Sequence, residues 1–573
     1  MLLGMRSALL GSVPALYLPF ALTGTLDSRV TFSRGTHATM YDSTGKLVYA
    51  PNNLLTFSQD FTNAAWASSN TPIRTSGQID PAGGTTATKL DLDVNDGIFQ
   101  FLGSRVGNFI FSIWVRGDSA GTTRLSDASS GAFDISVNVT TAWTRVNTGS
   151  RAISGLFSPY LYRGAGDLAT VYVAFSQLEQ VTYQTTPSTY NATTSAAYYG
   201  PRFDYNPATL VARGLLIEEA RTNTITSSQN FSGTGWFVDG AVLTPNAGVA
   251  PDGTNTATSI VTGTGNNRVY QFDNSGVTGN KVASFYVKSN AGSSISIGAT
   301  GAMSPPGPAV VNTATGTVTG FSGASVVPVR DGWFRVFLPV SVTTASGNST
   351  YWVISGPASS VFIWGFQLEA GSFATSYIPT AASAVARSAD SATMTGTNFS
   401  SWYNQTQGTF VANSECGGIS TAAFVAQAGV VGSGDYIDVL RLQPTTKYLV
   451  VDNSVQQVAI DLGVTPAAGV FNKSAVTYRV NDFAAAINGG AVLTDSVGDV
   501  PTPDRFFIGN SDGAYFLNGH IASIAYYNTR LPNATLQSLT LPVIADYYFL
   551  VTAGGDQLTD ASDNPLYTQP LYL

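Results

Sequence analysis

The sequence predicts an all-β protein made of several β-sandwich domains in tandem. Charged residues form 11% of its 573 residues, against about a quarter in an average soluble protein. Short runs that alternate apolar and polar residues lie between turn-forming Gly, Asn, Asp and Ser residues, and helix-period stretches are scarce. In "FIFSIWVRG", Phe111, Ile113 and Val115 fall on one face of a strand, with Trp114 and Arg116 on the other. The length is enough for about three to five domains, each with its own core.

Sequence matches that recur in the same order indicate an internal repeat. The matched pairs are "NLLTFSQDFTNAAW" (53–66) with "NTITSSQNFSGTGW" (223–236), "DPAGGTTATKL" (80–90) with "APDGTNTATSI" (250–260), "FSIWVRG" (111–117) with "ASFYVKS" (283–289), "AWTRV" (142–146) with "GWFRV" (332–336), and "QLE" at 177–179 with "QLE" at 367–369. Residues 53–190 and 223–388 are therefore predicted to be two copies of one β-sandwich.

The repeat accounts for two glutamates in the same setting, Glu179 and Glu369. A glycosidase needs two carboxylates about 5–10 Å apart around one bond, whereas a repeat supplies one carboxylate to each domain. We therefore expect each glutamate to accept hydrogen bonds from backbone N–H groups or to pair with a nearby arginine.

The rest of the chain divides into further segments. Residues 395–540 carry new strand patterns and are predicted to form a third domain, in which "LPNATLQSLT" predicts a short helix with Pro532 at its start and Asn533 as its cap. Residues 28–52 and 198–222 flank the first repeat and offer strand-like runs around turns. We expect these two segments to pair with each other or with symmetry mates, so that the first sandwich is inserted between them.

The two ends of the chain have different patterns. The N-terminal stretch imitates a signal peptide, but Pro14 and Pro19 interrupt its apolar run, which is shorter than the roughly 20 residues that span a bilayer. We expect residues 1–27 to be a docking segment that inserts into a partner protein, and we expect no membrane insertion. Residues 541–573 are turn-rich and alternate polar with apolar residues, which predicts a strand-rich tail.

Charge and residue counts exclude several function classes. The formal net charge is −8 at pH 7, so no basic surface is available for phosphates, and nucleic acid is not an expected partner. Cys416 is the single cysteine, which rules out a disulfide framework within the chain. His37 and His520 are the two histidines and have no partners at ligand spacing. P-loop and HExxH motifs are absent from the sequence. The sequence predicts no catalytic residue, no metal and no cofactor.

The candidate binding residues lie at matched positions of the two repeats: Trp114 with Arg116, and Tyr286 with Lys288. An outward aromatic ring beside a cation is a platform on which a sugar ring can stack. The alternative is that these side chains form a second layer of packing under a loop or against a neighbouring chain.

Structural roles explain the other conspicuous residues. Adjacent residues of a strand point to opposite faces, which predicts salt bridges for Glu218 and Glu219 with Arg202, Arg213 or Arg221. The Trp-x-Arg arrangement recurs in both repeats and is interpreted as packing, in Trp143 with Arg145 and in Trp333 with Arg335. The loops 495–504 and 510–519 are rich in oxygen ligands, but they lack the regular spacing of a calcium loop, and turn chemistry explains the same residues.

Several of these segments resemble bacteriophage virion appendage proteins, the head-spike and tail-fibre proteins. The resemblance starts with "TFSRGTHATMYDSTGKLV" (31–48), followed by "PRFDYNPATLVARGLLIEEARTN" (201–223), although here a whole sandwich intervenes. The two repeats resemble the carbohydrate-binding-module-like jelly rolls of such proteins, including the ending "WGFQLEAGSFATSYIPT" (364–380). Residues 395–540 resemble concanavalin A-like (laminin G-like) domains. The resemblance implies tandem jelly-roll sandwiches followed by a concanavalin A-like sandwich.

The expected function is that of a non-enzymatic bacteriophage virion structural protein, an elongated tail or head fibre or spike. The resemblance implies a homotrimer in the virion that is assembled in the host cytoplasm. It would dock into other virion proteins through its N-terminal segment and contribute to attachment to host-surface glycans. Two alternatives stay open. A glycan-degrading tailspike enzyme would use acids such as Glu179, Glu369 or those between 495 and 512. A purely architectural capsid or tail decoration protein would lack a receptor-binding surface.

Overall fold

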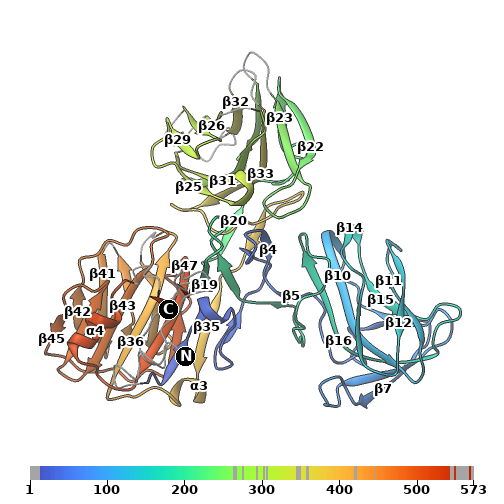
Figure 1. The fold of residues 1–573 in the computed structure, drawn as a ribbon, viewed down its shortest axis with the longest axis horizontal. Helices are drawn as coiled ribbons and strands as arrows, with labels where there is room; N and C mark the ends of the chain where they lie inside the picture. Colours follow the sequence, from blue (N-terminus) through green and yellow to red (C-terminus); the bar gives the residue numbers. More distant parts are fainter. Residues whose placement is uncertain are drawn as a thin grey trace.

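The computed structural model describes residues 13–542, apart from breaks at 262–266, 274–275, 292–293, 301–302, 305–306, 344–349, 356–359, 419–421 and 444, together with a strand pair near the C-terminus. The chain is all-β, as the sequence predicts, and its β-sandwich lobes surround a small central junction (Figure 1). Over the described ranges the helical elements are α2 (Phe20–Thr23), α3 (Thr397–Ser400), α4 (Asn533–Leu539) and the 3-10 turn η1 (Arg330–Gly332). No helix in these ranges has the length and apolar character needed to cross a membrane.

The first sandwich consists of two antiparallel sheets that enclose one core. One sheet runs in the order β13 (Thr144–Asn147), β10 (Ser104–Gly117), β16 (Thr170–Val181), β8 (Ala87–Asp91), β7 (Ile73–Gln78), with β14 (Arg151–Leu156) also paired to β10. The other runs β12 (Asp134–Val139), β11 (Gly121–Asp127), β15 (Pro159–Tyr162), β9 (Gly97–Phe99), β6 (Ala67–Ser69). Phe111, Ile113 and Val115 lie in the core, which confirms the alternation read from the sequence.

The second sandwich repeats this plan. One sheet runs β31 (Trp333–Val342), β25 (Gly279–Ser289), β33 (Ser360–Ala370), β23 (Ala257–Val261), β22 (Val242–Gly248), with β27 (Met303–Ser304) and β30 (Ser325–Pro328) also on β31. The other runs β21 (Trp236–Asp239), β24 (Arg268–Phe272), β32 (Thr350–Ser355), β26 (Ser294–Thr300), β28 (Gly307–Asn312), β29 (Thr317–Thr319). The order β31-β25-β33-β23-β22 is that of β13-β10-β16-β8-β7, and the central pair has a register shift at the matched place in each copy.

The third sandwich takes strands from outside residues 395–540. One sheet runs β18 (Arg202–Tyr205), β19 (Ala212–Ile217), β47 (Gly519–Tyr527), β36 (Gln407–Cys416), β43 (Asn472–Arg479), β44 (Phe483–Ile487), β45 (Leu493–Asp495), with β1 (Leu16–Leu18) on β47. The other runs β2 (Thr31–Ser33), β35 (Ser391–Thr395), β46 (Arg505–Ile508), β38 (Ala426–Gly429), β39 (Tyr436–Asp438), β41 (Thr445–Asp452), β40 (Arg441–Gln443), β37 (Ala423–Phe424), with β42 (Val455–Asp461) on β41. Strands β1, β2, β18 and β19 therefore come from the two segments that flank the first sandwich and from the N-terminal stretch.

The N-terminal segment differs from the expectation of a free docking element. Leu16, Leu18 and Phe20 are each 1% exposed and belong to the core of the third sandwich. An apolar run that is consumed by its own chain cannot also insert into a partner, so the docking prediction is wrong for this part of 1–27. Residues 1–12 of the predicted segment lie outside the described residues.

Short strand pairs connect the lobes. They are β3 (Thr39–Tyr41) with β4 (Leu47–Tyr49), β5 (Asn52–Asn53) with β17 (Tyr198–Tyr199), and β20 (Arg221–Asn223) with β34 (Val385–Arg387). Near the C-terminus, β48 (Tyr548–Phe549) pairs with β49 (Tyr567–Thr568). The chain leaves for the first sandwich at β5 and returns beside it at β17, so the segments around 28–52 and 198–222 do meet. The rest of the predicted tail lies outside the described residues.

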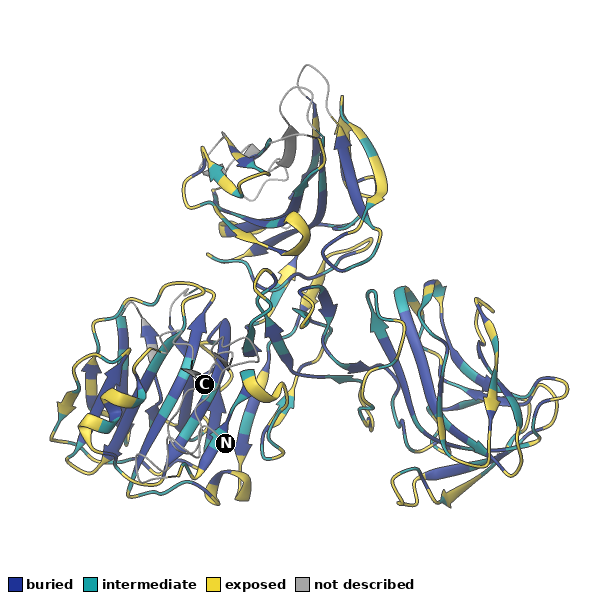
Figure 2. Ribbon diagram, viewed as in Figure 1, coloured by how far each residue is buried: buried dark blue, intermediate teal, exposed yellow. Residues whose placement is uncertain are grey.

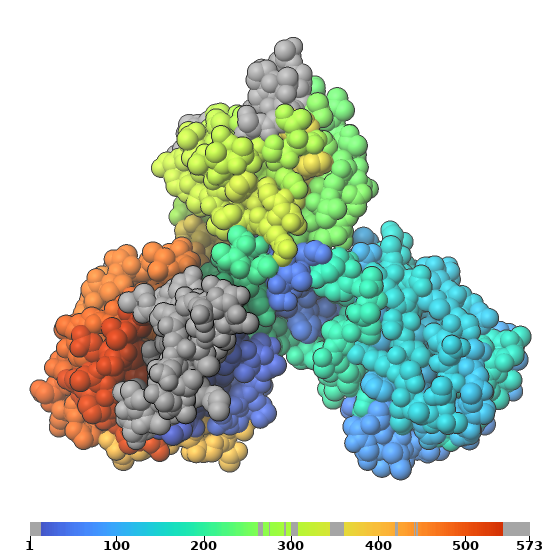
Figure 3. Space-filling model, viewed as in Figure 1, coloured from blue at the N-terminus to red at the C-terminus, as the bar shows by residue number. Residues whose placement is uncertain are grey.

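The lobes are arranged around the junction and do not form a line. Figure 2 shows buried residues on the inner strands of each lobe and also on the strands where the lobes meet. In the space-filling view each sandwich is a separate bulge (Figure 3). Within one chain the sandwiches therefore do not lie along one line, which differs from the elongated fibre or spike that the resemblance implies. The short helix at Asn533–Leu539 is confirmed, although Pro532 and not Asn533 occupies the cap position.

Candidate functional site

A network of buried charges holds the junction together. Arg202 Nη1 lies 2.5 Å from Glu218 Oε2, and Arg34 Nη1 lies 2.9 Å from Asp390 Oδ1. Arg202 also pairs with Asp390, and Arg387 Nη2 lies 3.4 Å from Glu218 Oε2. These side chains are at most 7% exposed. Because a buried charge is costly to leave unpaired, the network fixes chain segments that lie before, between and after the two repeats.

The arginines keep the carboxyl groups of this network ionised. Burial alone would raise the pKa of Glu218, but the charges of Arg387 and Arg202 lower it well below its usual value. Burial would likewise raise the pKa of Asp390, and the charges of Arg202, Arg34 and Arg387 lower it. Both groups are therefore anions at neutral pH, and neither can act as a general acid.

A second buried group links the junction to the third sandwich. His520 of β47 lies between two carboxylates: its Nε2 is 2.7 Å from Asp204 Oδ2, and its Nδ1 contacts Glu415 Oε1. Arg213 Nη2 lies 2.6 Å from the same Glu415 oxygen. The backbone N–H of Tyr41 donates to Asp204 Oδ1 at 2.6 Å. The side chains of His520, Asp204 and Glu415 are at most 7% exposed.

The carboxylates favour the imidazolium form of His520. Burial and the charge of Arg213 act to lower the pKa of His520, but the charge of Glu415 and hydrogen bonds to Asp204 and Glu415 raise it above its usual value. For Glu415, burial would raise the pKa, and the charge and hydrogen bond of His520 together with Arg213 lower it. In the imidazolium form both ring nitrogens donate to these carboxylates, and that form has no free lone pair with which to act as a general base.

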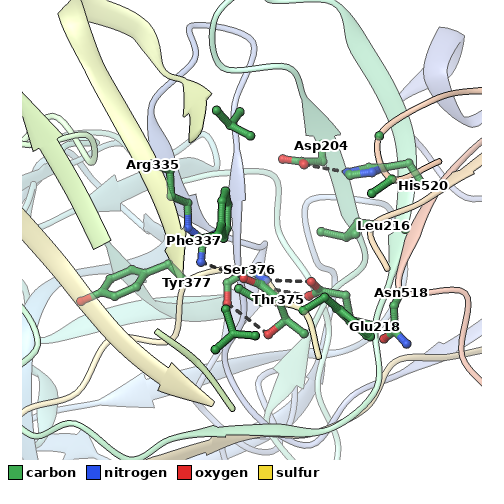
Figure 4. Close-up of a pocket in the computed structure, with 18 of the residues that line it drawn as sticks. Asp204, Leu216, Glu218, Arg335, Phe337, Thr375, Ser376, Tyr377, Asn518 and His520 are labelled. Atoms are coloured by element: carbon green, nitrogen blue, oxygen red, sulfur yellow. Dashed lines mark hydrogen bonds and ion pairs between the residues drawn. The ribbon is translucent and has the colours of Figure 1, made fainter. Parts of the chain in front are cut away.

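These residues line a cleft of about 470 Å³ between the second sandwich, the junction and the third sandwich. Figure 4 shows Asp204 and His520 on one side of it, with Arg335, Phe337 and Tyr377 on the other. Glycosidic cleavage needs one carboxyl group that is protonated and a second that is ionised. In this cleft Glu218 and Glu415 both have lowered pKa values, and each is ion-paired with a buried or half-buried cation, Arg202 and Arg213 respectively. The acidic and basic side chains that line the cleft neutralise one another and hold the adjoining segments together.

The other predicted structural roles of charged residues are confirmed. Glu179 accepts a hydrogen bond from Ser188 N at 3.0 Å, and Glu369 accepts one from Thr375 N at 2.9 Å. Burial raises the pKa of each of these glutamates, but they belong to separate sandwiches. The ion pair of Glu218 with Arg202 was noted above. The second predicted pair joins Glu219 and Arg221 at 2.5 Å.

The Trp-x-Arg repeat is also structural. Arg145 Nη2 donates to Ser112 Oγ at 2.9 Å, and Arg335 Nη2 donates to Ser284 Oγ at 3.1 Å. Each arginine also donates to a backbone carbonyl, of Ser188 and Thr375 respectively. Both copies thus use the arginine to hold the chain that follows the last strand.

The oxygen-rich loops of the third sandwich are explained by turns. Asp495 Oδ1 accepts from Val497 N at 3.1 Å, and Asn510 Oδ1 accepts from Gly513 N at 3.0 Å. Asp504 pairs with Arg505 at 2.7 Å. In the part of the chain that the structure describes, no cluster of three or more His, Cys, Asp or Glu side chains could hold a metal ion.

Trp114 and Arg116 lie on the outer face of β10 and are half-buried. The guanidinium carbon of Arg116 is 3.7 Å from the centroid of the Tyr172 ring and 5.5 Å from that of Trp143. The register explains the first contact, because Arg116 is directly opposite Tyr172 on β16. Phe175 adds a ring to the same lobe and stacks on Tyr190, with ring centroids 5.1 Å apart. We call Trp114, Arg116, Trp143 and Tyr172 the open face.

The matched face of the second sandwich is covered by the junction. Tyr286, which matches Trp114, is 0% exposed, and its hydroxyl is 2.8 Å from that of Tyr41 on the β3–β4 hairpin. Leu47 of the same hairpin packs with Tyr286, Trp333 and Trp364. The expectation of an outward aromatic ring is therefore wrong for Tyr286, because the hairpin occupies the space where a sugar would lie.

Lys288, which matches Arg116, is half-buried beside this covered face. It lines a pocket that Trp333, Lys46 and Arg330 share. Its partner across the sheet is Phe362, in the place that Tyr172 takes in the first copy. Lys288 therefore lies in a pocket of mixed charge next to the hairpin, with Lys46, Arg330 and Asp331, and the matched ring Tyr286 beside it is buried.

The two copies carry different residues at the matched β-bulge of the central strand pair. In the second sandwich the residue is Gly365, at φ +63°, where an added Cβ would lie 3.0 Å from Tyr286 Cδ2. In the first sandwich the bulge residue is Phe175, at φ +49°. A glycine lets Tyr286 and Tyr377 close up under the hairpin, whereas a phenylalanine in the first copy adds a ring beside a surface that no hairpin covers.

Sequence reasoning found the pair of Glu218 with Arg202 but missed the other long-range pairs of the junction. Asp204 and Glu415 are 316 and 105 positions from His520, and Arg34 is 356 positions from Asp390. No local spacing can reveal such pairs. The available signal was the presence of arginines and acids in otherwise strand-like segments of a chain with few charges.

No family model matches this chain, and no curated protein matches it. Among solved structures it is similar to the CBM40 of the Ruminococcus gnavus IT-sialidase bound to α2,3-sialyllactose, at 15% identity and a TM-score of 0.22, over 25% of this chain and 88% of that one. It is also similar to the N-terminal CBM22-1–CBM22-2 tandem domain of Paenibacillus barcinonensis Xyn10C, at 10% identity and a TM-score of 0.20, over 56% of this chain and 98% of that one. These structures are carbohydrate-binding modules with β-sandwich folds. At such identities and TM-scores nothing about ligand or activity is carried over from them.

Proposed function

We propose that this chain is a non-enzymatic structural protein of a bacteriophage virion, a tail or head appendage that contributes to attachment to host-surface glycans. The observation that carries the glycan part is the open face of the first sandwich. Trp114, Trp143 and Tyr172 are half-exposed there beside Arg116. Aromatic rings flanked by hydrogen-bond donors are the groups on which sugars stack.

The junction supports a role in presentation. Its buried ion pairs and the covered face of the second sandwich fix two lobes relative to each other, so binding surfaces would be held at set angles. Weak binding at each face would be strengthened by several copies on one particle. The virion location and a homotrimer are part of the proposal, and their support is the resemblance of residues 31–48 and 201–223 to the segments of phage appendage proteins.

The first test is binding of the labelled full-length chain to a glycan array and to bacterial cells, with release of reducing sugars measured in parallel. The proposal expects saturable binding without release of reducing sugars. Release would favour the glycan-degrading enzyme, and the absence of both binding and release would favour a purely architectural protein. Sedimentation of the same sample tests the oligomer, for which a species of three times the chain mass is expected.

A further inference from the structure

The guanidinium group of Arg116 is held by rings alone. Over the described residues, its contacts are those with Tyr172 and Trp143, and no carboxylate lies within ion-pair distance of it. Lys89, which lies opposite Tyr172 on β8, is paired with Asp91 at 3.0 Å. The matched structural arginine of this sandwich, Arg145, behaves differently, because it donates to Ser112 Oγ and to the carbonyl of Ser188.

This environment prepares Arg116 for an anion. Contact with an aromatic ring fixes the planar group without using its N–H donors. A guanidinium presents those donors as a fork that matches a carboxylate, and it binds carboxylate with two parallel hydrogen bonds. The guanidinium of Arg116 is held in place by packing, and its N–H donors have no partner among the described residues. An anion could therefore accept hydrogen bonds from these donors.

The neighbouring ring belongs to the same surface. Trp114 and Arg116 are two positions apart on β10, which places them on one face about 7 Å apart. A sugar ring on Trp114 would therefore bring a substituent within reach of Arg116. In the second sandwich the matched pair cannot do this, because Tyr286 is buried under the hairpin.

We infer that the open face takes an acidic glycan, a sugar chain that carries a carboxylate, with the carboxylate on Arg116 and a sugar ring on Trp114. The inference rests on the proposed glycan attachment and names the ligand class of that site. Sulfate esters share the anionic charge but not the planar, two-oxygen shape of the carboxylate, so they are expected to bind more weakly.

The test uses the full-length chain and a glycan array with carboxylated, sulfated and neutral members. Oligogalacturonate and its methyl ester are included because they differ only in the carboxylate. Wild type is expected to bind carboxylated members at least tenfold more tightly than their neutral counterparts. Arg116→Gln should remove that preference and leave weak binding of the neutral forms, and Trp114→Ala should weaken both. The matched control is Lys288→Gln in the second sandwich, which should change neither.

The outcomes separate the two proposals. Equal binding of acidic and neutral sugars, unchanged in Arg116→Gln but lost in Trp114→Ala, would overturn the acidic class and leave glycan attachment standing. A preference for sulfated members would also overturn the carboxylate assignment. Absence of binding to every member would overturn both. Circular dichroism of each variant establishes that loss of binding is not loss of fold.

Discussion

The two copies of the repeated sandwich use the same face in opposite ways. In the second copy Tyr286 and Trp364 are 0% exposed and lie under the β3–β4 hairpin. In the first copy Trp114 and Arg116 remain half-exposed, and the sandwich is attached by its end, where Gln180 Nε2 donates to the Tyr49 hydroxyl at 3.3 Å. The two copies thus have equivalent surfaces. The surface of the second copy packs against the junction, and the surface of the first copy is accessible to a ligand.

The largest effect is expected where the junction holds the covered face in place. Asp390→Ala leaves Arg34 and Arg202 without the carboxylate that both contact. Breaking a buried ion pair costs about 3–5 kcal/mol, and we expect the upper end because two arginines lose a partner. Urea denaturation followed by tryptophan fluorescence measures the loss. The control is Asp239→Ala, since its pair with Arg268 is about half exposed and such pairs contribute about 0.2–1 kcal/mol.

The second prediction compares matched substitutions on the two faces. Tyr286→Ala removes a buried ring and should lower the free energy of unfolding by about 3–4 kcal/mol, without a direct effect on glycan affinity. Trp114→Ala should cost about 1 kcal/mol but should weaken the binding of acidic and neutral glycans alike. If both variants lost stability equally and neither lost affinity, the contrast between the faces would be refuted.

The bulge residues sharpen the comparison further. Gly365→Ala places a Cβ 3.0 Å from Tyr286 in a left-handed backbone conformation, so we expect a cost of about 1–3 kcal/mol. Phe175→Gly in the first copy removes the stack on Tyr190, which is worth about 0.5–1.5 kcal/mol, and glycine suits the left-handed backbone at this position, φ +49°. Thermal unfolding of the two variants should therefore show the larger shift for Gly365→Ala, and the reverse order would contradict the account.

The smallest effect concerns pH at the junction. The native pKa of His520 is raised, so the stability it contributes is present below its unfolded value of about 6.5 and is lost as pH rises through the native value. The pKa values of Glu218, Glu415 and Asp390 are lowered, so their contribution is lost as pH falls below about 4.

Stability should therefore be highest between these limits. His520→Gln is expected to remove the decline on the alkaline side, in urea denaturation repeated across pH. On the acid side Glu415 loses the imidazolium that lowers its pKa, so its share of the acid decline should shrink, whereas the shares of Glu218 and Asp390 should stay. An alkaline decline that persists in His520→Gln would assign it to other groups.

Much of the fold could be predicted from the sequence, because its signals are local. The alternation around Phe111, Ile113 and Val115 places them in the core, and the ordered matches fit the equal strand orders of the two sandwiches. The recruitment of Leu16, Leu18 and Phe20 by the third sandwich could not be predicted, because an apolar run does not reveal which core it will join.

The candidate site was predictable only in part. Alternation places Trp114 and Tyr286 on the outer face of their strands, and both side chains do lie outside the sandwich cores. Whether that face meets water depends on Tyr41 and Leu47, which are far away in sequence. The same reason hid the partners of His520, since burial and pairing at the junction are set by tertiary contacts between distant segments.

The central claim is most directly tested by oxidative footprinting of the tryptophans in the full-length chain, with and without a saturating acidic glycan from the array. The account predicts that Trp114 and Trp143 are labelled in the free protein and protected by the glycan. Trp333 and Trp364, at 2% and 0% exposure, should stay unlabelled in both samples. Equal labelling of all four residues, or labelling of Trp114 that the bound glycan does not change, would contradict it.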